Sequence, residues 1–514
     1  TGGGVYKSDG SVSNCVVYAN YRDTADDNLV GTNKVGFSCA PELETGVNGN
    51  TSADPRFADA ANSNYRLDVG SPGTDTGTNR TWMTGTLDMD GNARLADADG
   101  SGGPVVDMGC YEAFDITDGP FRGNFSSDPP TGYLQFQAVL SAAAGGSNTT
   151  VTYYRWDFNN DGVDDLWGPG LGVVTQTFAL GFHNIRLIMT NSDEETFTYV
   201  SSNSVRVYPV EYFVATDGTP AIPYNSWATA SRDINSALEY AFADSSTTVV
   251  IHVEEGTYDE TNYVNVSKPL RIVSEKGPVS TVVRWPGSTD RTIKLTHSGA
   301  VFAGFTVSDT TRGAVKVENG IVSNCWLVSN VGSTHWMYGI GANISGGLVT
   351  HCLIAWNTNW TANNAGAGVS ISGGMLANSI ICSNVARTGT AGGVRMESSG
   401  AVRNCLIFDN VTQDADNGNG GGVYMDDAAN RLESCTVSGN VCPDARIAGG
   451  VYKSNGGVTN CIIFGNLSGA TADDLVGTNR VAFSSAPELE AGQNGNVTSD
   501  PLFRNAALND FRLT

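Results

Sequence analysis

The heptapeptide Asn404-Cys405-Leu406-Ile407-Phe408-Asp409-Asn410 contains a pattern that returns along the second half of the chain. An Asn-Cys-like pair is followed by two apolar residues, two variable residues and a closing Asn. The closing residues recur at intervals of 26 to 30 positions and comprise Asn330, Asn357, Asn384, Asn410, Asn440 and Asn466. A fixed period of this length is typical of solenoid proteins.

Each period holds three short β-prone stretches and no helical pattern, which predicts one coil of a parallel β-helix. An Asn at a fixed place in every coil can stack its amide on the coils above and below. Gly-rich entries such as Gly420-Gly421-Gly422 permit sharp corners between sheets. The recurring Cys position, where Ser379 substitutes once, is interpreted as a stack of small inward side chains with free thiols.

The edge of a solenoid needs a cap, and the sequence offers one before the first strands. An amphipathic helix is expected between Asn225 and Ala243. One face of this helix would carry Ile234, Ala237, Leu238 and Ala241.

A second repeat operates on a larger scale. Gly3-Gly4-Val5-Tyr6-Lys7 returns as Gly449-Gly450-Val451-Tyr452-Lys453, an offset of 446 positions. The match continues without a gap, so residues 447–514 repeat residues 1–68 with about half of the positions identical. Residues 1–113 are therefore expected to be the final coils and tail of one β-helix, and residues 211–514 a second one. We interpret the chain as one unit of 446 residues plus an overlap, cut from a longer tandem array.

Residues 114–210 lack the coil pattern and alternate like the strands of an antiparallel β-sandwich. Tyr154-Arg155-Trp156-Asp157-Phe158, followed by Phe178, Gly181 and an alternating run over 185–191, resembles a PKD domain. This resemblance implies an immunoglobulin-like β-sandwich of a kind common in bacterial surface proteins and secreted carbohydrate-active enzymes.

The flanking segments resemble a second class of protein. Tyr212-Phe213-Val214-Ala215-Thr216-Asp217-Gly218 looks like the opening of right-handed parallel β-helix proteins. Val106-Asp107-Met108-Gly109-Cys110 belongs to a segment similar to the tail that ends such proteins in large bacterial surface polypeptides. The resemblance implies an all-β chain, with a right-handed parallel β-helix plus a small antiparallel sandwich, located outside a bacterial cell or on its surface.

The charge composition of the chain argues against two classes of binding partner. The 514 residues include 62 Gly, 29 Lys and Arg and 53 Asp and Glu, which gives a formal net charge of −24. This acidity argues against nucleic acid and anionic lipid as partners, because either requires a basic patch. No run of apolar residues approaches the ~20 that a membrane-spanning helix needs.

A candidate calcium loop lies in the predicted sandwich. Asp157, Asn159, Asp161 and Asp165 place oxygen-bearing side chains at spaced positions, and Gly162 stands at the sixth position of the loop. Gly168 stands where a bidentate acid is expected, and a segment rich in Asp and Asn also makes a good turn. A structural calcium ion and a plain turn both remain open, and the sequence requires no cofactor.

Successive side chains of a strand point to opposite faces of the sheet. If Val394 and Val423 point inward, a group of polar side chains next to them lies on the outer face of neighbouring coils. The group comprises Arg395, Glu397, Tyr424 and Asp426, with Tyr452 beside them. Carboxylates on adjacent coils, about 5 Å apart, can shift each other's pKa and act on a polysaccharide. The same set is also typical of a solubilising surface, and we assign no catalytic residue.

Three tryptophans offer a binding interpretation. Trp336, Trp356 and Trp360 crowd two consecutive coils, where aromatic faces can stack on sugar rings. Packing within loops or against a neighbouring copy is the alternative.

The sequence favours a structural role, as a repeat unit of a giant extracellular protein that forms a fibre, sheath or adhesin. Its partners are expected to be copies of itself, head to tail or within one chain, together with extracellular polysaccharide. Two alternatives remain open: a carbohydrate-binding surface protein, and a secreted β-helix polysaccharide lyase or glycoside hydrolase.

Overall fold

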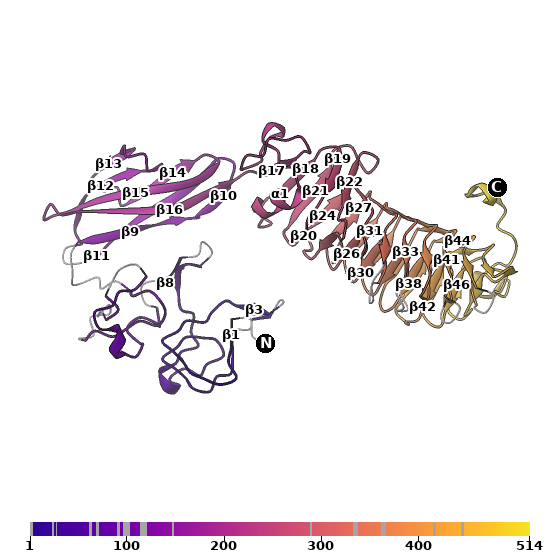
Figure 1. The fold of residues 1–514 in the computed structure, drawn as a ribbon, viewed down its shortest axis with the longest axis horizontal. Coiled ribbons are helices and arrows are strands. Elements are labelled where there is room, and N and C mark those ends of the chain that lie inside the picture. Colours follow the sequence, from indigo (N-terminus) through magenta and orange to yellow (C-terminus); the bar gives the residue numbers. More distant parts are fainter. Residues whose placement is uncertain are drawn as a thin grey trace. The chain divides into compact units, whose positions relative to one another are not determined.

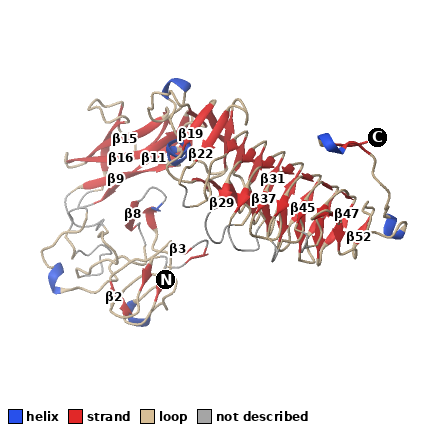
Figure 2. Ribbon diagram, turned by 45° about the vertical axis from the view of Figure 1, so that its right-hand side comes forward, coloured by secondary structure: helices blue, strands red, loops and turns tan. Residues whose placement is uncertain are grey.

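The computed structural model describes residues 4–22, 25–26, 28–60, 64–67, 71–89, 93–95, 103–113, 121–145, 149–287, 290–332, 338–360, 366–414, 418–443 and 447–514. The chain divides into two compact units, Thr1–Val207 and Tyr208–Thr514. Strands dominate the regular structure of both units, and helices are few and short (Figure 2). Residue 114, where the sandwich is predicted to begin, lies outside the described ranges, and the predicted domain bounds stay a prediction.

The second unit is a right-handed parallel β-helix, in which the strands of successive coils lie side by side (Figure 1). Four sheets run along it. The eleven-stranded β17–β52 sheet contains β17 (Glu211–Val214), β18 (Val249–Val253), β21 (Leu270–Ser274), β24 (Val301–Ala303), β27 (Ile321–Ser323), β31 (Leu348–Thr350), β35 (Met375–Ala377), β39 (Ala401–Arg403), β43 (Arg431–Glu433), β47 (Gly457–Thr459) and β52 (Val481–Ala482).

Two further sheets have nine strands each. The β19–β48 sheet contains β19 (Gly256–Asp259), β22 (Thr281–Arg284), β25 (Thr306–Val307), β28 (Trp326–Val328), β32 (Leu353–Ala355), β36 (Ile380–Cys382), β40 (Leu406–Phe408), β44 (Thr436–Ser438) and β48 (Ile462–Ile463). The β20–β51 sheet contains β20 (Val264–Val266), β23 (Ile293–Leu295), β26 (Val315–Val317), β30 (Ala342–Ile344), β34 (Val369–Ile371), β38 (Val394–Met396), β42 (Val423–Met425), β46 (Val451–Lys453) and β51 (Leu475–Val476).

The fourth sheet has seven short strands and turns antiparallel only at its last pair. The β29–β50 sheet contains β29 (Val331–Gly332), β33 (Thr358–Asn359), β37 (Val385–Ala386), β41 (Val411–Thr412), β45 (Val441–Cys442), β49 (Leu467–Ser468) and β50 (Thr471–Ala472). One coil therefore passes through β38, β39, β40 and β41 in turn. Its inward side chains Val394, Val402 and Ile407 are fully buried, and burying each such side chain contributes roughly 1.5–3 kcal/mol.

Each coil turns two of its corners with residues in the left-handed conformation. The residue before the Cys position has φ between 48° and 56° in Asn324, His351, Asn378, Asn404, Ser434 and Asn460. The residue before the closing Asn is also left-handed, as in Trp356 and Asp409, with φ of 56° and 52°. Asn is the side chain that tolerates this conformation best after Gly, which explains why it recurs in the Asn-Cys pair.

The closing Asn residues form a continuous ladder inside the β-helix, as the sequence predicts. Asn330, Asn357, Asn384, Asn410, Asn440 and Asn466 are fully buried. Each Nδ2 donates to the Oδ1 of the next residue at 2.9 Å, and the last one donates to Asp474 Oδ1 at 2.7 Å. The same Oδ1 atoms accept the backbone N–H of the preceding Asn at 3.0 to 3.1 Å. The buried amides therefore find their partners in neighbouring coils.

The recurring cysteines form a second interior stack. Cys325, Cys352, Cys405, Cys435 and Cys461 are buried, and no disulfide joins any two of the ten cysteines, each of which lies in a described range. Cys435 N–H lies 3.5 Å from Cys461 Sγ, and Ser379 Oγ accepts the N–H of Cys352 at 3.1 Å. The prediction of free, inward-facing thiols is confirmed.

Helix α1 (Ile234–Tyr240) packs at the start of the β-helix and is shorter than the sequence predicts. Asp233 caps it by accepting Ser236 N–H at 2.7 Å, and Ile234, Ala237 and Leu238 are buried. The predicted helix fails upstream because Ser231 pairs with Val214 as an isolated bridge, which extends the backbone, and only the short 3-10 turn η4 (Trp227–Thr229) precedes it.

The first unit begins with two short β-helix coils. β1 (Val5–Tyr6) pairs in parallel with β5 (Leu29–Val30), and β2 (Val12–Ser13) pairs with β6 (Val35–Gly36). The remaining short elements of this part are β3 (Tyr21–Arg22), β4 (Ala25–Asp26), η1 (Val47–Gly49), β7 (Phe57–Asp59), β8 (Asn64–Leu67) and η3 (Thr81–Met83). The tail packs on these coils, since Thr78 N–H donates to Asn14 Oδ1 at 2.8 Å and Gly109 N–H donates to Asn14 O at 2.9 Å.

Two antiparallel sheets follow in the first unit and share one apolar core. One contains β10 (Thr131–Tyr133), β16 (Thr196–Tyr208), β15 (Gly181–Asn191), β12 (Val151–Asp157) and β13 (Leu166–Gly168). The other contains β14 (Val173–Phe178), β11 (Phe136–Gly145) and β9 (Arg122–Asp128). Trp156, Leu140 and Leu187 are fully buried between them, and Trp156 Nε1 donates to Leu171 O at 2.9 Å. Membership of the PKD family stays a prediction.

The 446-residue repeat is reproduced residue by residue. Val5 pairs with Leu29 as Val451 pairs with Leu475, and Val12 pairs with Val35 as Val458 pairs with Val481. The hairpin of β7 and β8 recurs with the same register as β53 (Phe503–Asn505) and β54 (Asp510–Leu513), which flank the 3-10 turn η6 (Ala506–Leu508). The turn η1 recurs as η5 (Gln493–Gly495). Gly31 and Gly477 have φ of 89° and 90°, and a Cβ at either would collide with the carbonyl oxygen of Lys7 or Lys453.

We expect Asn410→Ala to destabilise the second unit by about 2 kcal/mol or more, because it strips the acceptor from the Asn384 amide and the donor from Ile381 O. Asn343→Ala is the matched control, since Asn343 is half-buried on the outer face and lies outside the ladder. Urea unfolding followed by far-UV circular dichroism measures both. Equal effects of the two substitutions would contradict a structural role for the ladder.

Asp474 ends the ladder at the position that Asn28 occupies in the first unit. Burial raises the pKa of Asp474 against the hydrogen bonds from Asn466 that lower it. A raised pKa in the folded state means that the stabilising contribution is present at acidic pH and is lost as pH rises through the folded pKa.

We therefore expect Asp474→Asn to stabilise the second unit at pH 8 by about 1 kcal/mol and to change little at pH 4. Thermal melts at the two pH values test this. Asn28→Asp is the mirror control and should destabilise the first unit at pH 8. A lower melting temperature for Asp474→Asn at pH 8 would show that the carboxylate itself is needed.

Candidate functional site

The outer face of the β20–β51 sheet carries one side chain per coil in a straight row. Each is the middle residue of a triplet whose neighbours point inward, as in Val315-Lys316-Val317. The register places in this row Asn265, Lys294, Lys316, Asn343, Ser370, Arg395, Tyr424 and Tyr452. Only the last three of these residues were predicted from the sequence to form an outward group. The middle position of each apolar triplet was the signal that could have found the others.

The sequence-predicted group does come together, and we call Arg395, Glu397, Tyr424, Asp426 and Tyr452 the Arg395 cluster. Arg395 Nε lies 3.4 Å from Glu397 Oε1, and its Nη2 lies 3.8 Å from Asp426 Oδ2. The guanidinium carbon stands 5.7 Å from the centre of the Tyr424 ring. Tyr424 and Tyr452 stack with centroids 5.1 Å apart and planes at 15°. Arg395 is thus shared between two carboxylates and an aromatic face.

Burial is the largest influence on the pKa values of both carboxyl groups in the Arg395 cluster. Burial raises the pKa of Glu397, and the nearby Asp426 raises it further while Arg395 lowers it. Burial likewise raises the pKa of Asp426 against the effect of Arg395. One guanidinium therefore does not offset the desolvation of two carboxylates. Such a pair can hold or transfer a proton near a bound hydroxyl group.

A second ion cluster on the same face behaves in the opposite way. Glu318 Oε1 lies 2.6 Å from Lys316 Nζ and 3.3 Å from Lys294 Nζ. Burial acts to raise the pKa of Glu318, but the two ammonium groups outweigh it and hold the pKa below its usual value. Two ammonium groups face one carboxylate here, whereas one guanidinium faces two carboxylates in the Arg395 cluster, and the pKa shifts of the two clusters have opposite directions.

Four buried polar atoms of the Arg395 cluster lack a hydrogen bond. They are Arg395 Nε, Arg395 Nη1, Glu397 Oε1 and Asp426 Oδ1. The N–H donors of the guanidinium thus lie beside the oxygen acceptors of the carboxylates, but these donors and acceptors are not aligned for hydrogen bonds with one another. A hydroxyl group both donates and accepts, so a polyol is the chemistry that this set matches.

Two of the three predicted tryptophans are described. Trp356 is 56 % exposed because it occupies one of the left-handed corners, and Trp360 is 54 % exposed just after β33. Arg387 covers the Trp360 ring, with its guanidinium carbon 4.1 Å from the ring centre, and its Nη1 donates to Gln413 Oε1 at 3.1 Å. Trp336 lies outside the described residues. Sugar stacking at these positions stays a prediction.

The predicted calcium loop closes through its own hydrogen bonds. Asp157 Oδ1 accepts Asp161 N–H at 3.2 Å, and Asp157 Oδ2 accepts Gly162 N–H at 2.9 Å. Arg186 Nη2 lies 3.0 Å from Asp157 Oδ2, and Asp165 Oδ2 accepts Phe158 N–H at 2.7 Å. Asn159 Oδ1 accepts Asp161 N–H at 3.0 Å. Calcium binding here stays a prediction, and across the described ranges no group of three His, Cys, Asp or Glu side chains is placed to hold a metal ion.

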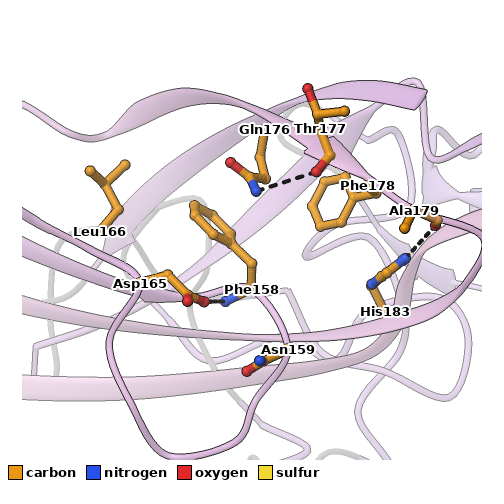
Figure 3. A pocket seen from close by; sticks show the side chains of 9 residues that line it. All are labelled: Phe158, Asn159, Asp165, Leu166, Gln176, Thr177, Phe178, Ala179 and His183. Carbon is orange, nitrogen blue, oxygen red and sulfur yellow. Dashed lines mark hydrogen bonds between the residues drawn. The ribbon is translucent and has the colours of Figure 1, made fainter. Parts of the chain in front are cut away.

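A pocket of about 380 Å³ opens beside this loop in the first unit (Figure 3). Its lining comprises Phe158, Asn159, Asp165, Leu166, Gln176, Thr177, Phe178, Ala179 and His183. The volume falls in the range of small-molecule sites. Its polar groups are largely engaged with the backbone, since His183 Nε2 lies 2.9 Å from Ala179 O and Gln176 Nε2 donates to Thr177 O at 3.3 Å.

Among the helices of the described residues, none is long and apolar enough to cross a membrane.

No protein-family model matches the chain, and no curated protein matches it. Among solved structures, the chain is similar to pectin methylesterase from carrot, with 13 % identity, a TM-score of 0.34 and coverage of 59 % of this chain and 97 % of that one. Pectin methylesterase from Aspergillus niger shows 12 % identity, a TM-score of 0.27 and coverage of 56 % and 90 %. ORF18 of Geobacillus virus E2 shows 13 % identity, a TM-score of 0.29 and coverage of 49 % and 57 %. Similarity at this level assigns no activity to the chain.

Proposed function

We propose that the chain is a repeat unit of a large extracellular or cell-surface protein in which β-helices and sandwich domains alternate in tandem. One observation carries the proposal: among the described residues of 5–67, strand pairings and single hydrogen bonds recur at an offset of 446 positions. Ser38 N–H donates to Asn50 Oδ1 at 3.1 Å, and Ser484 N–H donates to Asn496 Oδ1 at 3.1 Å. Lys7 Nζ binds Asn33 as Lys453 Nζ binds Asn479.

Such an array supports a role as a fibre, sheath or adhesin. A β-helix is a rigid rod because each coil is hydrogen-bonded to the next along the axis. The net charge of −24 keeps neighbouring rods apart by repulsion and favours a soluble, extended protein.

Electron microscopy of the native material tests this proposal. We expect elongated particles with β-helix rods repeating along one polypeptide, and a denatured mass several times the 53.9 kDa of this chain. Compact single particles with the mass of one β-helix would overturn the proposal.

A second function, saccharide binding, is favoured by the Arg395 cluster. Its unaligned guanidinium donors and carboxylate acceptors suit the neighbouring hydroxyl groups of a sugar. The coil spacing of ~4.8 Å is close to the length of one sugar ring in an extended chain. An extracellular polysaccharide lying along the row of outward side chains is the ligand class that we propose.

Glycan-array screening followed by calorimetric titration tests saccharide binding. Glu397→Gln and Asp426→Asn should each weaken binding by about tenfold, because each removes one charged acceptor, worth roughly 1.5 kcal/mol or more. Glu433→Gln is the matched control, because Glu433 forms a 2.5 Å ion pair with Arg403 on the β17–β52 sheet. Loss of binding in the control, or none in the two variants, would exclude this face as the site.

A further inference from the structure

The Arg395 cluster carries more negative than positive charge. One guanidinium, that of Arg395, lies 3.4 Å from the carboxyl group of Glu397 and 3.8 Å from that of Asp426. Burial raises the pKa of Asp426, Arg395 lowers it, and the adjacent Asp427 raises it again. A ligand with a cationic group would therefore balance the charge of this face.

Both carboxyl groups can be reached from outside the β-helix. The side chains of Glu397 and Asp426 are 28 and 33 % exposed, although each keeps one buried oxygen without a hydrogen bond. They directly follow β38 and β42, which lie side by side in adjacent coils (Figure 1). Adjacent strands of a sheet are ~4.8 Å apart, so one small cationic group can contact both carboxyl groups.

A second cluster on the same face shows what completes such a carboxylate. Glu318 follows β26 as Glu397 follows β38, and it lies 2.6 Å from Lys316 Nζ in its own coil. A second ammonium group, that of Lys294 in the coil before, lies 3.3 Å away. In the coil before Glu397, the same position holds Ser370. Glu397 therefore has a hydroxyl group where Glu318 has its second ammonium group.

The guanidinium adds a second requirement on the ligand. Nε and Nη1 of Arg395 are buried donors without a hydrogen bond, and they lie beside the two carboxyl groups. The ligand must thus offer a cationic donor and a neutral acceptor close together. A sugar ring with an amine on one carbon and a hydroxyl group on the next has this pair of groups.

We propose that the Arg395 cluster binds an amino sugar, with the ammonium group of the ligand between Glu397 and Asp426 and a neighbouring hydroxyl group against Arg395. This inference rests on the saccharide binding proposed above and names the class of sugar. A divalent metal ion is a poorer occupant, because Ca²⁺ prefers about six to eight oxygen ligands and the guanidinium repels it. A neutral sugar leaves the two carboxylates without a counter-charge.

Calorimetric titration with three oligomers of equal length tests the proposal: glucosamine, the same oligomer with every amine acetylated, and oligolysine. The glucosamine oligomer should bind about 100-fold more tightly than the acetylated one, since each carboxylate contributes roughly tenfold through a charge-assisted hydrogen bond. Oligolysine measures the general attraction of cations to a chain with a net charge of −24. It should bind at least about tenfold more weakly than the glucosamine oligomer at ~0.15 M salt.

Two variants assign the preference to the cluster. Glu397→Gln and Asp426→Asn should each lower the preference for the free amine about tenfold, because each removes one charged acceptor. Glu433→Gln is the matched control, since it removes the same charge from the β17–β52 sheet, and it should keep the full preference. Far-UV circular dichroism checks that all three variants fold.

Carbodiimide coupling, which joins an amine to a carboxyl group, needs no variant. Peptide mass spectrometry should find the glucosamine oligomer attached to Glu397 or Asp426, and attachment mainly elsewhere would overturn the proposal. Equal binding of the free and the acetylated oligomers would also overturn it, while leaving saccharide binding in place. Binding of neither oligomer would reject saccharide binding as well. If oligolysine binds as tightly as the glucosamine oligomer, charge alone explains the affinity and the amino sugar is rejected.

Discussion

The buried amide of the ladder asparagines is the constraint on which the rest of the second unit depends. An Asn side chain inside an apolar core is costly unless its oxygen and both of its N–H groups are bonded. Here the oxygen of Asn410 accepts from Asn384 in the coil before, and its nitrogen donates both to Asn440 in the coil after and to Ile381 O in the coil before. From Asn330 onward no coil satisfies its buried amide alone, so the ladder reinforces the register that the backbone pairing of the sheets sets.

Much of the β-helix was predictable because its determinants are local and periodic. The spacing of the closing Asn residues gave the coil, and apolar alternation placed Arg395 and Tyr424 outward, as observed. The left-handed corners were not predicted, because Trp356 and Asp409 are poor indicators of such a conformation. The extent of α1 was also missed, since the pairing of Ser231 with Val214 is a tertiary contact that helical periodicity does not contain.

The candidate sites show where sequence reasoning stops. Alternation brings Arg395, Glu397 and Asp426 to one face, but the sharing of one guanidinium between two carboxylates is visible only in the structure. Spacing left a calcium ion or a plain turn open for the loop at Asp157, and the structure adds that Arg186 and backbone N–H groups contact that carboxylate. Residue type and spacing predict which charged groups lie close together. The charge balance among those groups then determines their ion pairs and the direction of their pKa shifts.

The order of hydrogen bonds along the axis has a mechanical consequence. The chain winds around the axis, so a force that pulls on its end unwinds one coil at a time instead of shearing the whole rod. Every coil that peels away leaves behind the next ladder asparagine and the next row of backbone amides, with which it can pair again. A rod built in this way unfolds under load one coil at a time, and each unfolded coil can pair again with the coil that remains.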